Sequence, residues 1–281
     1  MAYKDIIVFV DAPSASMHRL RIAADLARRS MAHLIGIYVV PDNIDHHSHD
    51  GFARGQRAVR QVLERHRSSQ ERAILQAGRQ FADLVGDKGI QAELRLVWNT
   101  ESDRNVLLNS FYADLVIVGQ TEPRGLPEHW LPEHLLLATG VPMLIVPNNW
   151  TSDSVGTRIL IAWNASKEAR RAATDALPLL SEAELVKILV VDPNRNPGRH
   201  GEEPGANIAL HLARHGAPVD VEQLESDGAS IADAVVNAAI RHNADLIVMG
   251  VYSHGRSRQL LFGSVTRAVL KNTTVPVLIS H

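Results

Sequence analysis

Hydrophobic residues along this chain form two alternating patterns: short continuous runs, and longer stretches in which apolar positions recur every three or four residues. A run such as DLIVMG (245–250) has no polar face, which indicates a strand buried on both sides of a sheet. Strands that alternate with helices predict a doubly wound α/β domain. In the second half, strands are expected near 158–163, 185–191, 218–224, 245–250 and 276–280, and helices are expected to start near 166, 205, 229 and 263.

The pattern of the second half repeats that of the first, in four blocks that keep the same order. The blocks are DIIVFVDAPSAS with RILIAWNASKEA, NTESDRNVLLNS with DGASIADAVVNA, ADLVIVGQ with ADLIVMGV, and GVPMLIVP with TVPVLISH. The second pair carries capping-box patterns, Thr100 to Asp103 and Ser230 to Asp233. We therefore expect two tandem Rossmann-like domains, 1–150 and 151–281, each with a five-stranded parallel sheet, joined in the polar stretch near 147–157.

The two halves differ in the middle. Residues 52–88 have the periodicity of a long amphipathic helix that ends at a glycine, whereas the corresponding stretch of the second half is rich in proline and glycine before a short helix. The duplicates have therefore diverged, and we expect one of them to have kept a role that the other lost.

Composition narrows the choice of partners. The chain is 45% hydrophobic and 21% charged, with a formal net charge of -2, which argues against nucleic acid or an anionic membrane as the main partner. The sequence contains no cysteine, which excludes disulfides, thiolate catalysis and cysteine metal sites. The first apolar run ends at Asp11, too soon for a signal peptide, and no run reaches the roughly 18 residues of a membrane span. A cytoplasmic location is expected.

The glycines at 250, 255 and 263 raise the question of a phosphate site. Gly250 to Ser257 approaches the P-loop pattern, but Arg256 stands where that loop needs a compact lysine. A hydrolase nucleophile elbow around Ser253 would need a glycine where Val251 stands. Both alternatives are disfavoured.

A third interpretation rests on the end of a strand and the start of a helix. The strand ends at Gly250, a loop follows, and Gly263 with Ser264 opens the last helix. Exposed N–H groups and the helix dipole favour a phosphate there. Gly263 leaves room for a close approach, the Ser264 hydroxyl can add a hydrogen bond, and Arg256 can neutralise further phosphate charge.

The spacing G-x2-S-x9-G-S resembles the motif G-x2-G-x9-G-[ST] of the universal stress protein family. The strand ends VDAPSAS and AWNASKEA and the terminal segments VPMLIVP and VPVLIS extend the resemblance over the whole chain as a tandem pair. The resemblance implies an adenine nucleotide, ATP or AMP, in the C-terminal domain, with Mg²⁺ accompanying ATP. It places adenine near Ala162, Asn164 and Val190, with Trp163 either stacked on the base or packed at the strand end, and sugar and phosphates along Met249, Gly250, Ser253, Gly263, Ser264 and Val265.

Two residues depart from the family pattern. Ser253 replaces the second glycine of the motif and adds a Cβ where a phosphate should come close, which weakens the site without abolishing it. Asn164 replaces the family's aspartate after the first strand, so nucleotide preference can change. The first half has Asp11 at that position but lacks the Gly-Ser helix start and gains prolines after Gly119, and we expect no nucleotide there.

The resemblance also implies the role and the assembly. We expect binding and signalling under stress, with hydrolysis slow or absent, because no general base or Mg²⁺ ligand is evident and no residue is assigned as catalytic. The two terminal strands are expected to pair inside one chain, since sheet edges must be covered, so that the tandem mimics a dimer and could form a homodimer.

Two alternatives remain open. The chain could be a protein-interaction module that uses the 52–88 helix and binds no nucleotide. It could also bind a metal or small ligand through His46, His47 and His49, although sequence neighbours in a loop rarely close a metal site and a solvated loop is favoured. His129 and His134 lack the i, i+4 spacing of a helical metal site.

Overall fold

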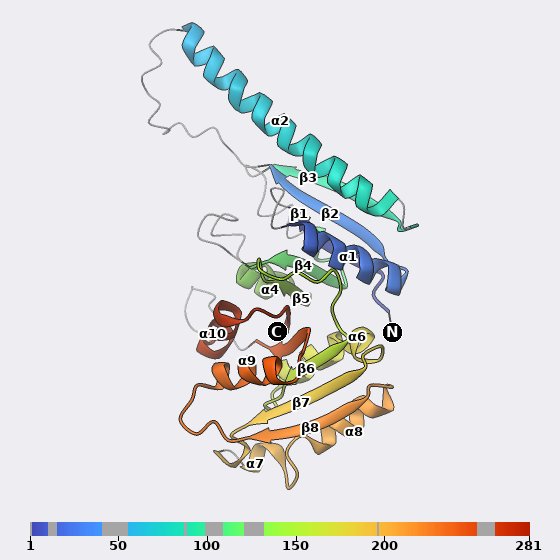
Figure 1. Cartoon of the computed structure of the whole chain (residues 1–281), viewed down its shortest axis with the longest axis vertical. Coiled ribbons are helices and arrows are strands. Elements are labelled where there is room, and N and C mark those ends of the chain that lie inside the picture. The colour runs from blue at the N-terminus through green and yellow to red at the C-terminus, as the bar shows by residue number, and fades with distance from the viewer. Residues whose placement is uncertain are drawn as a thin grey trace.

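In this computed structural model, strands from both halves of the chain form a single ten-stranded sheet (Figure 1). The described residues are 2–10, 16–40, 56–86, 89–98, 109–120, 132–195, 197–251 and 262–281. The strand order is β3-β2-β1-β4-β5-β10-β9-β6-β7-β8. The strands are β1 (Asp5–Val10), β2 (His33–Val40), β3 (Ala92–Trp98), β4 (Leu115–Gly119), β5 (Met143–Val146), β6 (Arg158–Ala162), β7 (Leu185–Val191), β8 (Val219–Leu224), β9 (Leu246–Gly250) and β10 (Val277–Ser280).

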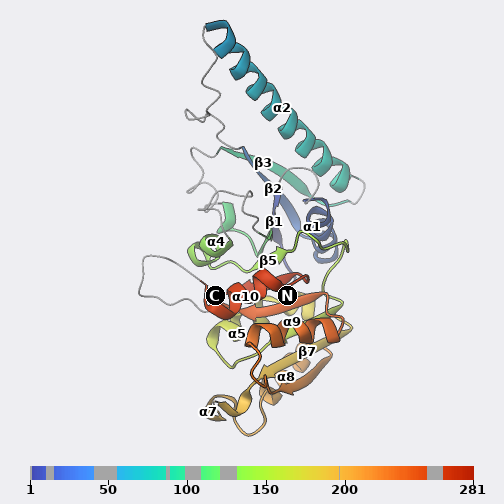
Figure 2. The ribbon, with the colours of Figure 1, turned by 60° about the vertical axis from the view of Figure 1, so that its left-hand side comes forward.

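Helices cover both faces of this sheet, as the two views show together (Figures 1 and 2). Buried side chains of α1, α2, α5, α6 and α8 share one hydrophobic core, and those of α4, α9 and α10 share the other. The helices are α1 (Ser16–Ser30), α2 (Gln56–Gly86), α4 (Pro132–Thr139), α5 (Lys167–Asp175), α6 (Leu177–Leu180), α7 (Pro197–His200), α8 (Ala206–Arg214), α9 (Ile231–Arg241) and α10 (Ser264–Asn272), with a 3₁₀ turn η3 (Pro193–Arg195).

Each half of the chain supplies five mutually parallel strands, and the halves meet where β5 and β10 pair in antiparallel orientation. The register places Leu278 opposite Leu144. This pairing is the one expected for the two terminal segments, and it turns two sheet edges into one continuous sheet. Because β5 and β10 run in opposite directions, the carboxyl ends of the strands in the two halves lie at opposite edges of the sheet.

Successive side chains of a strand point to opposite faces of the sheet, and in this sheet both faces are covered by helices. In β1, Ile6 and Val8 belong to the core under α1, while Ile7 and Phe9 belong to the core on the other face. A strand that is buried on both faces needs an apolar residue at every position. The tandem doubly wound fold expected from the sequence is thus present, with the two sheets fused into one.

The strands of the second half begin and end within about two residues of their expected positions, and α5, α8, α9 and α10 begin within two residues of theirs, within the usual spread of boundary assignments. The short elements α6, η3 and α7 were not expected. The Ser230 cap is formed: the Ser230 hydroxyl accepts from the backbone N–H of Asp233 at 3.0 Å and donates to the Asp233 carboxylate at 2.7 Å. The matching pattern at Thr100 and Asp103 lies outside the described residues. In the first half, α2 is the expected long helix, 31 residues from Gln56 to Gly86.

Besides the pairing of β5 with β10, polar side chains also connect the two halves of the chain. The buried Tyr3 hydroxyl donates to the carbonyl oxygen of Asp175 at 2.9 Å. Arg29 donates to the carbonyl oxygen of Val155 at 3.0 Å and pairs with Glu182 at 2.9 Å. On the other face, the Gln120 side chain donates to the carbonyl oxygen of Leu270 at 2.6 Å.

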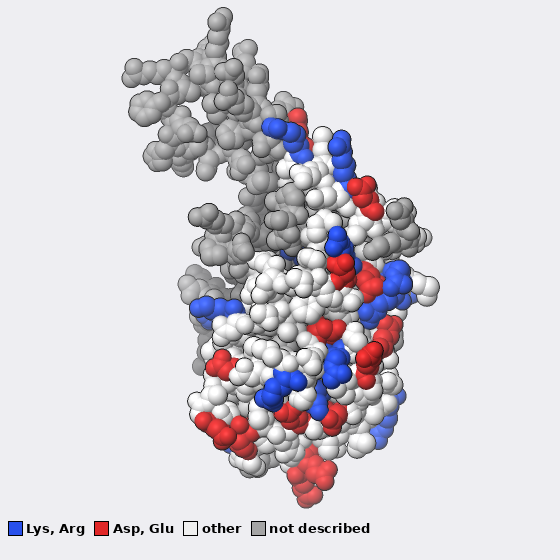
Figure 3. Space-filling model, viewed as in Figure 1, with Lys and Arg blue, Asp and Glu red and all other residues white. Residues whose placement is uncertain are grey.

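The surface carries charges of both signs. Figure 3 shows lysine, arginine, aspartate and glutamate interspersed over the described part of one face. Helix α2 projects beyond the sheet in both ribbon views (Figures 1 and 2). Among the described residues, no helix combines the length and apolar character that crossing a bilayer requires.

Candidate functional site

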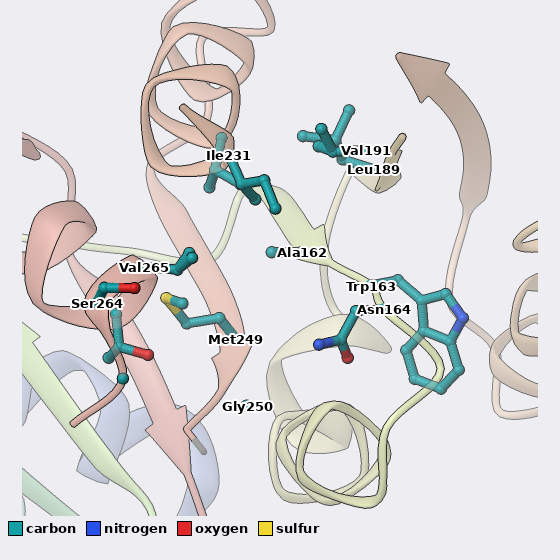
Figure 4. Close-up of a pocket in the computed structure, with 13 residues that line it drawn as sticks. Ala162, Trp163, Asn164, Leu189, Val191, Ile231, Met249, Gly250, Ser264 and Val265 are labelled. Atoms are coloured by element: carbon teal, nitrogen blue, oxygen red, sulfur yellow. The ribbon is translucent and has the colours of Figure 1, made fainter. Parts of the chain in front are cut away.

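A pocket of about 310 Å³ opens at the carboxyl ends of β6, β7 and β9, against the first residues of α9 and α10 (Figure 4). Its volume lies at the lower end of the range for small-molecule sites, roughly 300 to 1,000 Å³. In open parallel sheets, ligands bind at this edge. The described lining residues are Ala162, Trp163, Asn164, Leu189, Val191, Ile231, Val235, Met249, Gly250, Gly263, Ser264, Val265 and Thr266.

One wall is built by a sharp turn that follows β6. The backbone N–H of Trp163 still donates to β7, at 2.8 Å from the carbonyl oxygen of Leu189. Asn164 then accepts a hydrogen bond from the backbone N–H of Ser166 through its Oδ1 at 3.2 Å, and Ala165 between them has a φ of 54°. The Ser166 hydroxyl caps α5 by accepting from the N–H of Ala169 at 3.1 Å. This turn leaves Asn164 exposed at the pocket.

The opposite wall is the start of α10. Gly263 occupies the N-cap position with φ -57° and ψ 157°, no side chain caps the first turn, and no acidic residue lies in that turn. The first N–H groups of a helix lack partners within the helix, and its dipole places positive charge there. Since Gly263, Ser264, Val265 and Thr266 all line the pocket, this end of α10 can hold an anion with backbone N–H groups and hydroxyls.

Between these walls the pocket is apolar. Ala162, Leu189, Val191, Ile231, Val235 and Met249 contribute aliphatic or thioether surface from β6, β7, β9 and α9. Ile231, the first residue of α9, is 40% exposed, so its aliphatic surface is available to a ligand. An apolar wall beside an anion-binding end suits an amphipathic ligand with a flat ring at one end and a phosphate at the other.

Gly250 has a structural role in addition to its place at the pocket. A Cβ on this residue would overlap the backbone nitrogen of Ala169 and the carbonyl carbon of Glu168, and would lie 2.7 Å from the Glu168 carbonyl oxygen. The start of α5 therefore packs directly on the end of β9. The glycine at the end of this strand is needed for helix packing, whether or not a ligand is bound.

Eight of the residues expected at the site line the pocket: Ala162, Trp163, Asn164, Met249, Gly250, Gly263, Ser264 and Val265. Val190 does not; it is fully buried in the core on the α8 face, because neighbouring side chains of a strand point to opposite faces. Its neighbours Leu189 and Val191 line the pocket instead. Ser253 and Arg256 lie outside the described residues.

The indole of Trp163 turns away from the cavity (Figure 4) and packs against the core on the α5 and α8 face. Of the two interpretations of this residue, the geometry favours packing at the strand end over stacking on a ligand.

Five lining residues were not expected from the sequence: Leu189, Val191, Ile231, Val235 and Thr266. Alternation along β7 indicates that Leu189 and Val191 share one face and that Val190 lies on the other, but it does not say which face meets the cavity.

A buried carboxylate next to the pocket stabilises the ends of β7 and β8. Asp192 follows Val191 with φ 51° and is 6% exposed. The backbone N–H of Ser226 donates to it at 2.7 Å and the Ser226 hydroxyl at 2.8 Å, while Arg195 pairs with it at 3.1 Å. The backbone and side-chain hydrogen bonds from Ser226, helped by the Arg195 charge, hold the pKa of Asp192 below its ordinary value.

The corresponding edge of the first half differs. A Cβ on Gly119, the counterpart of Gly250, would overlap the guanidinium of Arg19. Arg19 is 1% exposed and donates through Nε to the carbonyl oxygen of Phe9 at 3.0 Å. A buried arginine side chain therefore occupies the position that the start of α5 takes in the second half. Asp11 and the segment after Gln120 lie outside the described residues.

The histidine-rich segment with His46, His47 and His49 also lies outside the described residues, as does His129. Within the described parts of the chain, no three or more histidine, aspartate or glutamate side chains come together as a metal site would require.

Comparisons with known proteins agree with the tandem fold. The model of the universal stress protein family matches the chain twice, at residues 2–147 and 157–281. Universal stress protein Slr1230 of Synechocystis is 27% identical over 148 residues, 52% of this chain and 49% of that protein. Stress response protein NhaX of Bacillus subtilis is 35% identical over 78 residues, 28% of this chain and 45% of that protein. The aligned segments thus span about half the length of these relatives.

Two solved structures match over nearly the full length. A universal stress protein from Archaeoglobus fulgidus aligns with a TM-score of 0.69 at 17% identity, covering 98% of this chain and 97% of that one. A functionally unknown protein from Pseudomonas aeruginosa PAO1 aligns with a TM-score of 0.55 at 14% identity, covering 99% and 92%. At these identities the likeness establishes the shared fold.

Proposed function

This chain belongs to the universal stress protein family as a tandem of two family domains, and from that premise we propose that its C-terminal half binds an adenine nucleotide, ATP or AMP. The nucleotide would occupy the pocket between β6, β9 and α10 and act as a signal in a stress response. Hydrolysis would be slow at most, and Mg²⁺ would enter only together with ATP.

The observation that carries this proposal is the uncapped start of α10, which opens on the same cavity as an apolar wall. Gly263 leaves the first N–H groups of the helix accessible, and Ser264 adds a hydroxyl. A phosphate at this position gains charge-assisted hydrogen bonds and the favourable end of the helix dipole.

The apolar wall is suited to contact the purine base of a nucleotide whose phosphate lies at the start of α10. Ile231 and Val191 offer aliphatic surface on the side of the cavity remote from Gly250 (Figure 4). A purine ring gains by leaving water for such a surface, at roughly 25 cal/mol for each Å² of apolar area buried. The sugar would lie between the base and the phosphate, near Ala162, Asn164 and Met249. The base would then lie farther from Ala162 and Asn164 than the family resemblance implies.

Equilibrium binding of ATP and AMP by calorimetry tests the proposal, with Gly263→Val as the diagnostic variant. Gly263 already has a φ of -57°, so valine fits the backbone but places a branched side chain where the phosphate should approach. We expect affinity to fall about tenfold or more. Gly86→Val is the matched control, because nothing lies within 4 Å of a Cβ at that position.

Two results would overturn the proposal. The first is that neither nucleotide binds the wild-type chain with a Kd below about 1 mM, the affinity of a weak contact. The second is that Gly263→Val leaves the Kd unchanged while the variant unfolds at the same urea concentration as the wild type.

A second candidate function is protein interaction through α2. This helix is 31 residues long and projects beyond the sheet in both ribbon views (Figures 1 and 2). Its Leu75 is 59% exposed. A chain that works only in this way would bind no nucleotide, so the calorimetric experiment also separates the two candidates.

A further inference from the structure

Asn164 presents a hydrogen-bond donor to the pocket, and its orientation is set by the turn that follows β6. Its Oδ1 accepts from the backbone N–H of Ser166 at 3.2 Å. The opposite end of a side-chain amide is an NH₂ group, which only donates. Figure 4 accordingly shows the Asn164 nitrogen on the cavity side and its oxygen on the side of α5.

The reverse orientation is unfavourable. With the amide flipped, the NH₂ group would face the Ser166 N–H, and two donors would oppose each other. A carboxylate at this position would keep the bond to Ser166 with one oxygen and turn its second oxygen toward the cavity. Asparagine and aspartate would therefore share the turn but offer the ligand opposite groups, a neutral donor or an anionic acceptor.

The opposite wall offers donors too. The start of α10 provides backbone N–H groups and the Ser264 hydroxyl, and Figure 4 shows Ser264 across the cavity from Asn164. Among the described lining residues, none carries a carboxylate that would repel an anion. A ligand that satisfies both walls needs acceptor groups at two separate places.

We propose that Asn164 determines specificity by admitting a nucleotide with a second phosphate on its ribose, bound at the β6 end while the 5′-phosphate lies at the start of α10. This inference rests on the proposed function, because it assigns the nucleotide of that same pocket. The ribose phosphate accepts from the Asn164 NH₂ group, and a carboxylate there would repel it.

The test compares AMP with adenosine 3′,5′-bisphosphate by calorimetry on the wild-type chain and on Asn164→Asp. The wild type should bind the bisphosphate at least as tightly as AMP. Asn164→Asp should weaken the bisphosphate about tenfold or more, because two anions then face each other. It should weaken AMP by less than about threefold, because a ribose hydroxyl can donate to the new carboxylate.

Asn207→Asp is the matched control. Asn207 is exposed on α8, which packs on the opposite face of the sheet, so the variant adds the same charge away from the pocket. It should change neither Kd. Asn164→Ser is a second variant: its hydroxyl can still accept from Ser166, but it removes the NH₂ group and adds no charge, and it should weaken the bisphosphate more than AMP.

The inference is overturned if Asn164→Asp changes both Kd values by the same factor, or if the wild type binds AMP but discriminates against the bisphosphate. Either result would leave the proposed function standing. If the wild type binds neither nucleotide, the proposed function fails, and the inference fails with it.

Discussion

Gly250 lies so close to Ala169 that a Cβ on the glycine would overlap the backbone nitrogen of the alanine. The strand end and the helix start touch through backbone atoms, with no side chain between them. A glycine that the motif alone associates with a ligand is thus also required by packing, and mutations there act on stability before they act on binding.

Gly250→Ala should therefore destabilise the chain. Forcing a methyl group into packed backbone costs typically about 1 to 3 kcal/mol, and more where the backbone cannot move. Urea unfolding at neutral pH measures the loss. Gly198→Ala is the control, because nothing lies within 4 Å of a Cβ there. Equal stability of Gly250→Ala and the wild type would contradict the close approach of α5 and β9.

Ile231→Ser should weaken nucleotide binding about five- to tenfold, since it removes apolar surface that would face the base. Ile231 is 40% exposed, so stability should change little. Ile240→Ser is matched to it: Ile240 lies on the same helix, is 57% exposed and does not line the pocket. If both variants bind AMP as the wild type does, the base does not lie against α9.

Tyr3→Phe should lower the free energy of unfolding by about 1 kcal/mol, the usual contribution of a hydrogen bond. The variant keeps the buried ring but leaves the carbonyl oxygen of Asp175 without its partner. Tyr112→Phe provides the comparison, because Tyr112 is 81% exposed and its hydroxyl reaches water. A similar small effect for both variants would mean that the bond between the two halves adds nothing to stability.

Asp192 should give the chain an acid-sensitive contribution to stability. Because its pKa is lowered in the folded state by Ser226, the contribution is present above the unfolded pKa of about 3.9 and is lost as pH falls through the folded value. Asp192→Asn should unfold at a lower urea concentration than the wild type at pH 7. The difference should shrink below about pH 4.

Asp227→Asn is the control for that experiment. Asp227 also has a positive φ, 48°, but its side chain is exposed. Asparagine tolerates this backbone conformation, so neither substitution should strain the chain. A difference between Asp192→Asn and the wild type that stays constant from pH 7 to pH 3 would refute the role of the charged form.

The main strands and helices of the second half could be predicted because the residues on their buried faces are apolar and recur at the spacing of a strand or a helix. The run that forms β9 is apolar at every position since helices cover both faces of the sheet. The start of α9 is marked by Ser230, whose side chain caps the first turn. Both patterns involve residues close together in the chain, so they can be recognised in a single sequence.

The pocket was predictable only in part. Gly263 and Ser264 follow from a motif with fixed spacing, whereas Ile231 and Thr266 have the apolar or polar character of many other helix positions. Their place in the pocket depends on how α9 and α10 pack on the sheet. Val190 and Leu189 are equally apolar in sequence, and only the register of β7 decides which of them faces the cavity.

The sequence by itself determined the duplication, the order of the main strands and helices, and the edge of the sheet at which the pocket opens, because repeats, periodicity and turn residues are properties of neighbouring positions. The tertiary structure alone decided which groups face each other. It placed the backbone of α5 against Gly250, turned the Trp163 ring away from the cavity and directed the Asn164 amide nitrogen into it. Side-chain direction depends on contacts between segments far apart in the chain, and periodicity carries no record of those contacts.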